Sequence, residues 1–326
     1  MKNWLRALGA FTFSFAIAAG AFAQSYPNKP IRLIIGFSAG GATDSIGRLY
    51  AQKLSELLQQ PVIVDNRPGA NQIAAIRLLQ SSPADGYNLY LGTGSSLAQG
   101  PGMRRDLPYD PLKDFTLIGM VATTPGAIVV HPGLPVSNIR ELIAYSKTHP
   151  DAINYGSAGM GTANHLHTEY LMSAVGTRWT HIPFKSDADV VREVSENRIQ
   201  LSISTTQTTI PLIKAGRLKV LAVTTNKPLK YLPGVPTLQE TGVKGMDGLE
   251  PYTFYGLVGP MGMPADVVSR LNGALNQISS MPDVALRMSE TFFSEVAMGS
   301  PASFRDFMDK EVAKWREVSK TVKLPE

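Results

Sequence analysis

One pattern occurs twice in this sequence and constrains the fold more than any other: an apolar run, a glycine-rich connection and an amphipathic helix. The first copy covers residues 31–48, where an apolar run at 31–35 is followed by Gly40 and Gly41 and then by apolar residues at helical spacing. A short apolar run without helical periodicity is typical of a parallel strand buried on both faces. Glycine allows backbone angles and close approaches that a β-carbon would prevent. We therefore predict a strand, a tight connection and a helix here.

The start of this helix is a candidate anion site. Thr43 and Asp44 are good N-cap residues. The first N–H groups of a helix have no partner within the helix, so a carboxylate or phosphate can accept their hydrogen bonds. Asp44 can also pair with Arg48 one turn later, and its carboxylate can orient the N–H donors of the connection. The alternative is that the glycines serve packing alone.

The second copy covers residues 153–166, with a strand at 153–155, a connection from Gly156 to Thr162 and a helix that continues through Leu166. A chain of 326 residues is long enough for two α/β domains, each with its own core. Further strands are expected at 61–65, 88–91, 181–184, 199–204, 218–223 and 252–258, extended segments that can cross between domains at 115–121 and 127–130, and helices at 71–80, 137–148, 187–196, 208–215 and from 264 onwards.

Small polar residues follow several of these strands. Ser95 and Ser96 come after the predicted strand at 88–91, and Thr205 comes after the one at 199–204. Open α/β sheets bind ligands beyond the carboxyl ends of their strands. We therefore expect these hydroxyl-bearing loops to join the two glycine-rich connections around one cleft.

The first 23 residues have the features of a secretory signal peptide. Lys2 and Arg6 precede an apolar stretch, and Ala21-Phe22-Ala23 is a small-x-small cleavage pattern. Cleavage after Ala23 lowers the formal net charge from +5 to +3, which is too small and too dispersed to indicate nucleic-acid binding. The sequence contains no cysteine, so neither a disulfide nor a lipidated cysteine is expected. A soluble periplasmic protein fits these features.

Motifs for catalysis, metals and cofactors are missing or incomplete. Neither glycine-rich connection reads G-x-G-x-x-G, and no phosphate-binding loop ending in Gly-Lys-Ser or Gly-Lys-Thr occurs. Ser157 stands in Tyr155-Gly156-Ser157-Ala158-Gly159, which fails the nucleophile motif G-x-S-x-G at its first position. His165 and His167 are two residues apart and do not share a helix face. We expect no cofactor, no metal and no enzyme activity; a serine hydrolase that uses Ser157 and His165 stays open as an alternative.

Several segments, in this order, resemble one known family. They are Tyr26-Pro27-Asn28-Lys29-Pro30-Ile31, Ala39-Gly40-Gly41-Ala42-Thr43-Asp44, Asn66-Arg67-Pro68-Gly69-Ala70, Asp85-Gly86-Tyr87, Tyr155-Gly156-Ser157-Ala158-Gly159 with Gly161 and His165, Lys214-Ala215-Gly216-Arg217, and Pro236-Thr237-Leu238-Gln239-Glu240. Over nearly its whole mature length the chain resembles the Bug family, the TctC-like periplasmic substrate-binding receptors of tripartite tricarboxylate transporters.

The resemblance implies an α/β, two-domain Venus-flytrap fold of the type II periplasmic-binding-protein kind, with the ligand cleft between the domains. Domain 1 would comprise residues 24–124 and 249–326, and domain 2 residues 125–248. In this family the two glycine-rich connections hold carboxylates through backbone N–H groups, hydroxyls and water, with little help from arginine. Together with the hydroxyl loops and two aromatic side chains, the candidate ligand-binding residues are Phe37, Ser38, Ala39, Gly40, Gly41, Thr43, Asp44, Ser95 and Ser96 in domain 1, and Ser157, Gly159, Thr162, His165, Phe184 and Thr205 in domain 2.

The sequence departs from the family pattern at three places. Pro183-Phe184-Lys185-Ser186 stands for the usual Pro-Tyr-Lys-Gly, Asn71-Gln72-Ile73 for a second glycine pair, and Phe254 for a tryptophan. These departures leave the ligand open among aliphatic mono-, di- and tricarboxylates, amino acids and aromatic acids. The expected partners are a small carboxylate and integral-membrane transporter subunits, with the receptor itself a monomer. A ligand-sensing receptor for a membrane signalling partner is an alternative with the same fold.

Overall fold

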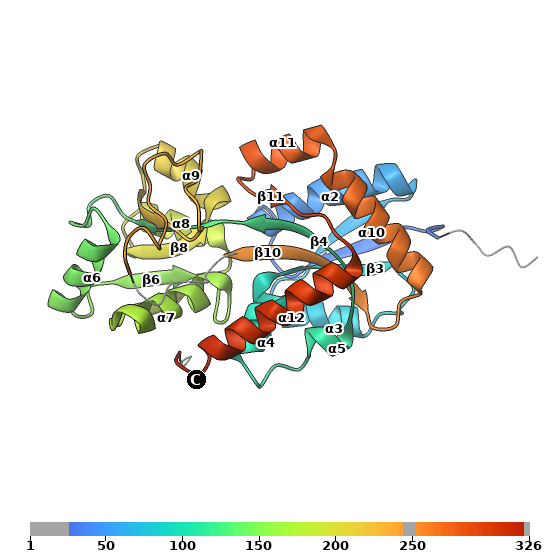
Figure 1. Cartoon of the computed structure of the whole chain (residues 1–326), viewed down its shortest axis with the longest axis horizontal. Helices are drawn as coiled ribbons and strands as arrows, with labels where there is room; N and C mark the ends of the chain where they lie inside the picture. Colours follow the sequence, from blue (N-terminus) through green and yellow to red (C-terminus); the bar gives the residue numbers. More distant parts are fainter. Residues whose placement is uncertain (1–25, 244–251, 323–326) are drawn as a thin grey trace, which may run out of the picture.

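The computed structural model describes residues 26–243 and 252–322, and the predicted signal peptide lies outside this part of the chain. Two β-sheets form the centres of two lobes that lie side by side along the long axis of the molecule (Figure 1). We call the lobe with the six-stranded sheet the first lobe and the lobe with the five-stranded sheet the second lobe. Within the described residues, no helix combines the length and the apolar character needed to cross a bilayer.

The first lobe is built on a sheet with strand order β11-β4-β10-β3-β1-β2. β1 pairs in parallel with β2 and β3, whereas β10 runs antiparallel between β3 and β4. The strands are β1 (Ile31–Ile35), β2 (Val62–Asn66), β3 (Asn88–Thr93), β4 (Phe115–Thr124), β10 (Thr253–Pro260) and β11 (Glu295–Val296). Its helices are α2 (Ala42–Leu58), α3 (Ile73–Gln80), α4 (Gly100–Met103), α5 (Pro111–Asp114), α10 (Ala265–Ser279), α11 (Pro282–Glu290) and α12 (Pro301–Val318).

Both faces of this sheet are covered, as the continuous apolar run of β1 predicts. Leu33 packs in a core cluster with residues of α2 and α10, and its neighbour Ile34 packs in a second cluster with residues of α3 and α12. Successive side chains of a strand point to opposite faces, so each residue of β1 meets a different helical layer. The sheet therefore lies between two helical layers.

The second lobe has the strand order β7-β6-β8-β5-β9, with β6 parallel to β7 and β8, and β5 antiparallel to β8 and β9. Ile128 packs with residues of α6 and α7, and Val129 packs with residues of α8 and α9. The strands are β5 (Gly126–Val130), β6 (Asn154–Ser157), β7 (Thr180–Pro183), β8 (Leu201–Thr205) and β9 (Lys219–Val223), and the helices are α6 (Ile139–Thr148), α7 (Ala163–Val175), α8 (Asp187–Ser195) and α9 (Thr206–Lys214).

Several segments of the described chain link the two lobes. β4 ends at Thr124 in the first sheet and β5 begins at Gly126 in the second, so the predicted crossing segments are confirmed. Tyr252 packs in a second-lobe core just before β10 enters the first sheet. Helix α12 contributes Phe304 to the first-lobe core and Trp315 to the second-lobe core, and Figure 1 shows it lying across the first lobe with its C-terminal end towards α7.

Two segments differ from the sequence-based expectation. The helix predicted from residue 71 begins at Ile73, because Asn71 and Gln72 have positive φ angles of 50° and 70° and form the short turn η1 (Ala70–Gln72). Glycine adopts such angles readily, and this is where the resembled family has its second glycine pair. The loop expected at Ser95 and Ser96 is instead a π-helical turn, η2 (Ser95–Gln99), which leads into α4. The Gly-Pro-Gly sequence that follows does not suggest a helix.

Candidate ligand-binding site

A cavity of about 570 Å³, partly open to solvent, lies where the two lobes meet. Both lobes contribute to its wall. The first-lobe side consists of Phe37, Ser38, Gly41, Ala42, Thr43, Thr93, Ser95, Thr253 and Tyr255, and the remaining lining residues are Ala158, Thr162, Ala163, Asn164, Ser186, Asp187, Thr205 and Tyr252. A second cavity shares Phe37, Ser38 and Ala158 with it and continues past Pro68, Gly69, Asn71, Gln72, Gly159, Phe184 and Lys185.

The connection from β1 to α2 forms one end of the first cavity. Gly40 has a φ of +88°, an angle that favours glycine, and Gly41 is the N-cap of α2. The first helical hydrogen bond runs from the Ser45 N–H to the Gly41 carbonyl, so the preceding N–H groups at the helix start are not used within the helix. The start of α2 therefore offers hydrogen-bond donors beside the cavity.

Asp44 lies in the first turn of α2, as does Thr43, because the N-cap is Gly41 and neither of these two expected residues. Oδ2 of Asp44 accepts the Gly40 N–H and Arg48 Nε, both at 2.9 Å, and its Oδ1 accepts Asn66 Nδ2 at 3.0 Å. Burial opposes ionisation, yet the hydrogen bonds from Arg48, Gly40 and Asn66 hold the pKa of Asp44 below its usual value. The predicted pairing with Arg48 and the predicted orientation of the connection are both present.

The connection from β6 to α7 is built in a similar way in the second lobe. Gly159 and Gly161 have φ angles of +117° and +75°, and Thr162 is the N-cap of α7. The Gly161 N–H donates to His165 Nδ1 at 3.2 Å. A β-carbon on Gly161 would lie 2.7 Å from Asn71 Nδ2 of the first lobe, so glycine lets the lobes approach each other here.

The buried histidines of the second lobe are neutral. His165 Nδ1 accepts a hydrogen bond, so the ring carries its proton on Nε2. Burial and the neighbouring His181 lower the pKa of His165 to about 3, and burial lowers the pKa of His181 to about 4. His165 accepts the Gly161 N–H and packs against the rings of Tyr155 and His181, so it caps this connection and packs within the lobe.

Ser157 is fully buried, and its hydroxyl is engaged inside the protein. Its Oγ lies 2.6 Å from His181 Nε2 and 3.0 Å from the Gly159 carbonyl oxygen. The histidine beside Ser157 is therefore His181, whereas the hydrolase alternative named His165. A nucleophile must reach its substrate, and this hydroxyl lies beneath the surface of the cavity.

The candidates from the sequence fall into three groups. Those that line the first cavity are Phe37, Ser38, Gly41, Thr43, Ser95, Thr162 and Thr205. Those that line the second are Gly159 and Phe184, together with Phe37 and Ser38. Those that line neither are Ala39 and Gly40, which are exposed at the tip of their loop, and Asp44, Ser96, Ser157 and His165, which are buried behind it.

Several lining residues were not among the candidates. Tyr252, Thr253 and Tyr255 lie in or just before β10, which the sequence places correctly but cannot orient. Asn164 and Asp187 lie in the first turns of α7 and α8, each of which follows a parallel strand. That position after a parallel strand is the signal that could have found them.

The wall of the first cavity is rich in hydroxyl groups and short of cations. Among the described lining residues none is Lys, Arg or His, and Asp187 is the acidic one. No group of three His, Asp or Glu side chains in the described part of the chain could hold a metal ion. The cavity is therefore suited to a small polar organic molecule held by hydrogen bonds.

Comparison with known proteins identifies the family. Residues 46–324 match the family described as "Tripartite tricarboxylate transporter family receptor". The chain belongs to this receptor family. Among curated relatives, a UPF0065 protein of Cupriavidus necator is 34% identical over 82% of this chain and 80% of its own, and protein BugT of Bordetella pertussis is 29% identical over 98% and 97%.

Solved structures similar to this receptor share its two-lobed fold. An R. palustris protein determined with adipate superposes with a TM-score of 0.85 and is 32% identical, over 91% of this chain and 98% of that one. The periplasmic binding protein BugD gives a TM-score of 0.83 at 29% identity, over 92% and 100%. These similarities confirm the α/β two-domain fold of the periplasmic-binding-protein kind, and they place the receptor among binding proteins.

Proposed function

We propose that this chain is a periplasmic receptor that captures a small carboxylate between its lobes and delivers it to the membrane subunits of a tripartite tricarboxylate-type transporter. The observation that carries the proposal is the meeting of two helix N-termini, those of α2 and α7, at one cavity. The N–H groups at the start of α2 are not used within that helix, and such groups favour an anion. Membership of the receptor family and the adipate-bound relative support the same ligand class.

The free energy needed for micromolar binding favours a ligand that contacts both lobes. A helix N-terminus contributes about 0.3–1 kcal/mol and a hydrogen bond to a charged group about 1.5–3 kcal/mol, whereas micromolar binding needs about 8 kcal/mol. One helix N-terminus with one such hydrogen bond therefore supplies about 4 kcal/mol at most, which is short of this value. A ligand held by both lobes can reach it, and it also shifts the population towards a closed form that a membrane partner can recognise.

In the proposed receptor, domain 1 comprises residues 24–124 and 249–326, and domain 2 comprises residues 125–248. The change of sheet between Thr124 and Gly126 supports the first boundary. Export would follow from the signal peptide, with cleavage after Ala23. We expect the mature receptor to be a monomer, because the proposed site is built from one chain.

Isothermal titration calorimetry of the mature chain tests the proposal. The panel consists of aliphatic mono- and dicarboxylates, citrate, amino acids and aromatic acids, with uncharged amides of the same size as controls. We expect micromolar or tighter binding of at least one carboxylate and none of its amide. Absence of binding across the panel, or turnover of an ester, would contradict the proposal. Cross-linking to co-expressed membrane subunits then separates transport from signalling.

A further inference from the structure

Asp187 lines the first cavity and is held there in a fixed orientation. It is the first residue of α8, directly after the N-cap Ser186. Its Oδ1 accepts Asn164 Nδ2 at 2.7 Å. Its Oδ2 accepts the Thr205 N–H at 3.2 Å, the Thr205 hydroxyl at 2.8 Å and the Thr208 hydroxyl at 2.6 Å. Groups from α7, the end of β8 and α9 therefore hold this carboxylate.

Three helices of the second lobe begin at this carboxylate. Asn164 lies in the first turn of α7, Asp187 in the first turn of α8, and Thr205 is the N-cap of α9. Helix N-termini stabilise an anion through their free N–H groups and their dipoles. Here the protein supplies that anion itself. A ligand carboxylate that approached the same place would meet a fixed negative charge.

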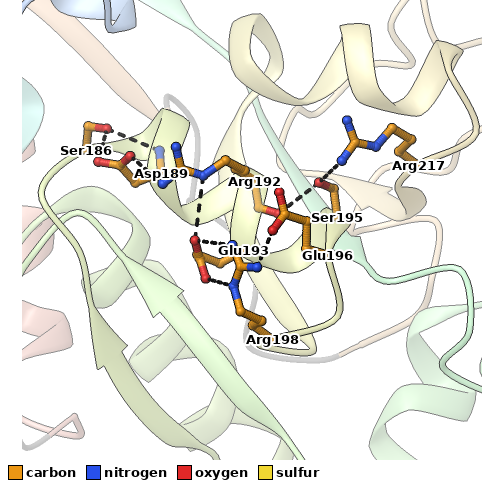
Figure 2. A network of polar contacts seen from close by, with 8 residues as sticks. All are labelled: Ser186, Asp189, Arg192, Glu193, Ser195, Glu196, Arg198 and Arg217. Atoms are coloured by element: carbon orange, nitrogen blue, oxygen red, sulfur yellow. Dashed lines mark hydrogen bonds and ion pairs between the residues drawn. The ribbon is translucent and has the colours of Figure 1, made fainter.

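No cation among the described residues pairs with Asp187. In the first lobe, Asp44 has Arg48 at 2.9 Å. On α8 itself, Asp189 has Arg192 at 3.2 Å, and Figure 2 shows these two residues in a network that includes further arginines and glutamates. Because the described lining residues of the first cavity also include no Lys, Arg or His, the charge of Asp187 is left for the ligand to balance.

The charge of Asp187 acts across the cavity. Tyr255 belongs to β10 and packs in the first-lobe core. Burial raises the pKa of Tyr255 to about 12, and the negative charge of Asp187 contributes to that rise. Asp187 in the second lobe therefore influences the first-lobe wall of the same cavity.

We propose that the ligand carries one carboxylate and one ammonium group, and that Asp187 binds the ammonium group. This inference rests on the proposed function. Oδ1 of Asp187 accepts one hydrogen bond from the described residues, which leaves capacity for a second donor. The ligand carboxylate then lies at the opposite end, beside Gly41 and Thr43 at the start of α2. Asp187 is thus a specificity-determining residue that selects amino acids and disfavours dicarboxylates of the same length by charge repulsion.

Titration with length-matched ligand pairs tests this assignment. The pairs are β-alanine with succinate, 4-aminobutyrate with glutarate, and 5-aminopentanoate with adipate, to which α-amino acids and the corresponding hydroxy acids are added. Each ligand is measured with the wild-type chain, with Asp187→Asn and with Asp189→Asn. The last variant is the matched control, because Asp189 is on the same helix, lines neither of the two cavities, and also accepts hydrogen bonds, from the Ser186 hydroxyl and from Arg192. Circular dichroism and thermal unfolding verify that the variants are folded.

We expect the amino carboxylates to bind about tenfold to a hundredfold more tightly than their dicarboxylate partners, the range of one charge-assisted hydrogen bond. Asp187→Asn should abolish or invert this preference, and Asp189→Asn should leave it unchanged. Tighter wild-type binding of dicarboxylates or hydroxy acids, or a preference that survives in folded Asp187→Asn, would overturn the assignment and leave the proposed function standing. Failure of every carboxylate to bind would overturn both.

Discussion

The connections before α2 and α7 have the same backbone design but use different chemistry at one equivalent position. In each, a glycine with positive φ precedes the N-cap and donates its N–H to the side chain four residues later: Gly40 to Asp44, and Gly161 to His165. Asp44 is an ionised carboxylate paired with Arg48, whereas His165 is a neutral, fully buried imidazole. The design therefore requires an acceptor at this position but not a charge.

Acidification should destabilise the connection at His165 before the connection at Asp44, and it should lower the free energy of unfolding more than any change below. The pKa values of His165 and His167 are lowered to about 3 by burial, and that of His181 to about 4. Between these values and about 6.5 the unfolded state binds more protons than the folded state, so stability falls as pH falls through this window. At pH 5 the loss is about 2 kcal/mol for each of the fully buried His165 and His167, and less for the partly exposed His181 because solvent screens its charge. Asp44, with its lowered pKa, keeps its contribution until the pH falls below about 4.

Urea unfolding at pH 7 and pH 5 measures this loss. Hydrogen exchange at the Gly161 and Gly40 amides shows which connection opens first as the pH is lowered. We expect the Gly161 amide to lose its protection at a higher pH than the Gly40 amide does. Equal stability at the two pH values would contradict the claim that these histidines are neutral in the folded protein. Loss of protection of both amides at the same pH would contradict the claim that the two connections differ in their sensitivity to acid.

Removal of the imidazole should be the next largest effect. His165→Ala deletes a fully buried side chain and leaves the Gly161 N–H without its acceptor, which should cost about 2–4 kcal/mol. The measurement is urea unfolding at pH 7. His149→Ala, at the exposed C-cap of α6, is the control and should change stability by less than about 0.5 kcal/mol. A similar cost for both would show that His165 does not support the connection.

A side chain at the start of α2 should reduce ligand binding without unfolding the lobe. A β-carbon on Gly41 meets only the Ser38 carbonyl oxygen, at 3.9 Å, and its φ of −83° suits any residue. Gly41→Val should therefore keep its thermal unfolding temperature while affinity falls by at least about tenfold, or 1.4 kcal/mol. Calorimetry with the tightest carboxylate checks this. Unchanged affinity would show that this connection serves packing alone.

Among the changes expected to lower stability, neutralisation of Asp44 in the first connection should have the smallest effect on the free energy of unfolding. Asp44→Asn keeps one acceptor oxygen but turns the other into a donor that faces Gly40 and Arg48 or Asn66, and it loses an ion pair whose Arg48 side chain is 54% exposed, so stability should fall by about 1–2 kcal/mol. A urea titration at pH 7 measures it, with Asp65→Asn as the control at another arginine-paired aspartate. A loss of 3 kcal/mol or more would mean that the first connection requires the negative charge of Asp44 and not only a hydrogen-bond acceptor.

The sequence predicts the backbone of the site better than its wall. Apolar runs and glycines have local signatures, so β1, β6 and the starts of α2 and α7 are found at nearly the observed residues. The side chains that line the cavity depend on how elements from distant parts of the chain meet. Asp187 looks like an ordinary residue in the first turn of a helix, and only the convergence of α7, α8 and α9 gives its carboxylate a place in the wall.

The backbone at Gln72 also depends on distant segments and could not be predicted from the local sequence. Its positive φ is unusual for a residue with a long side chain and is not visible in the sequence. The side chain is buried, where Nε2 donates to Ser95 and Oε1 accepts from Tyr90 and Thr93. These bonds between distant segments hold the strained turn, so no local pattern could have indicated it.

The order of strands determines when each sheet can be completed during synthesis. β5 to β9 are continuous along the chain, so the second sheet can be completed as soon as residue 223 is available. The first sheet needs β10 between β3 and β4, and β10 ends at Pro260. The sheet that is begun first is therefore completed last, and a nascent or C-terminally truncated chain would expose the apolar strands β3 and β4 to solvent.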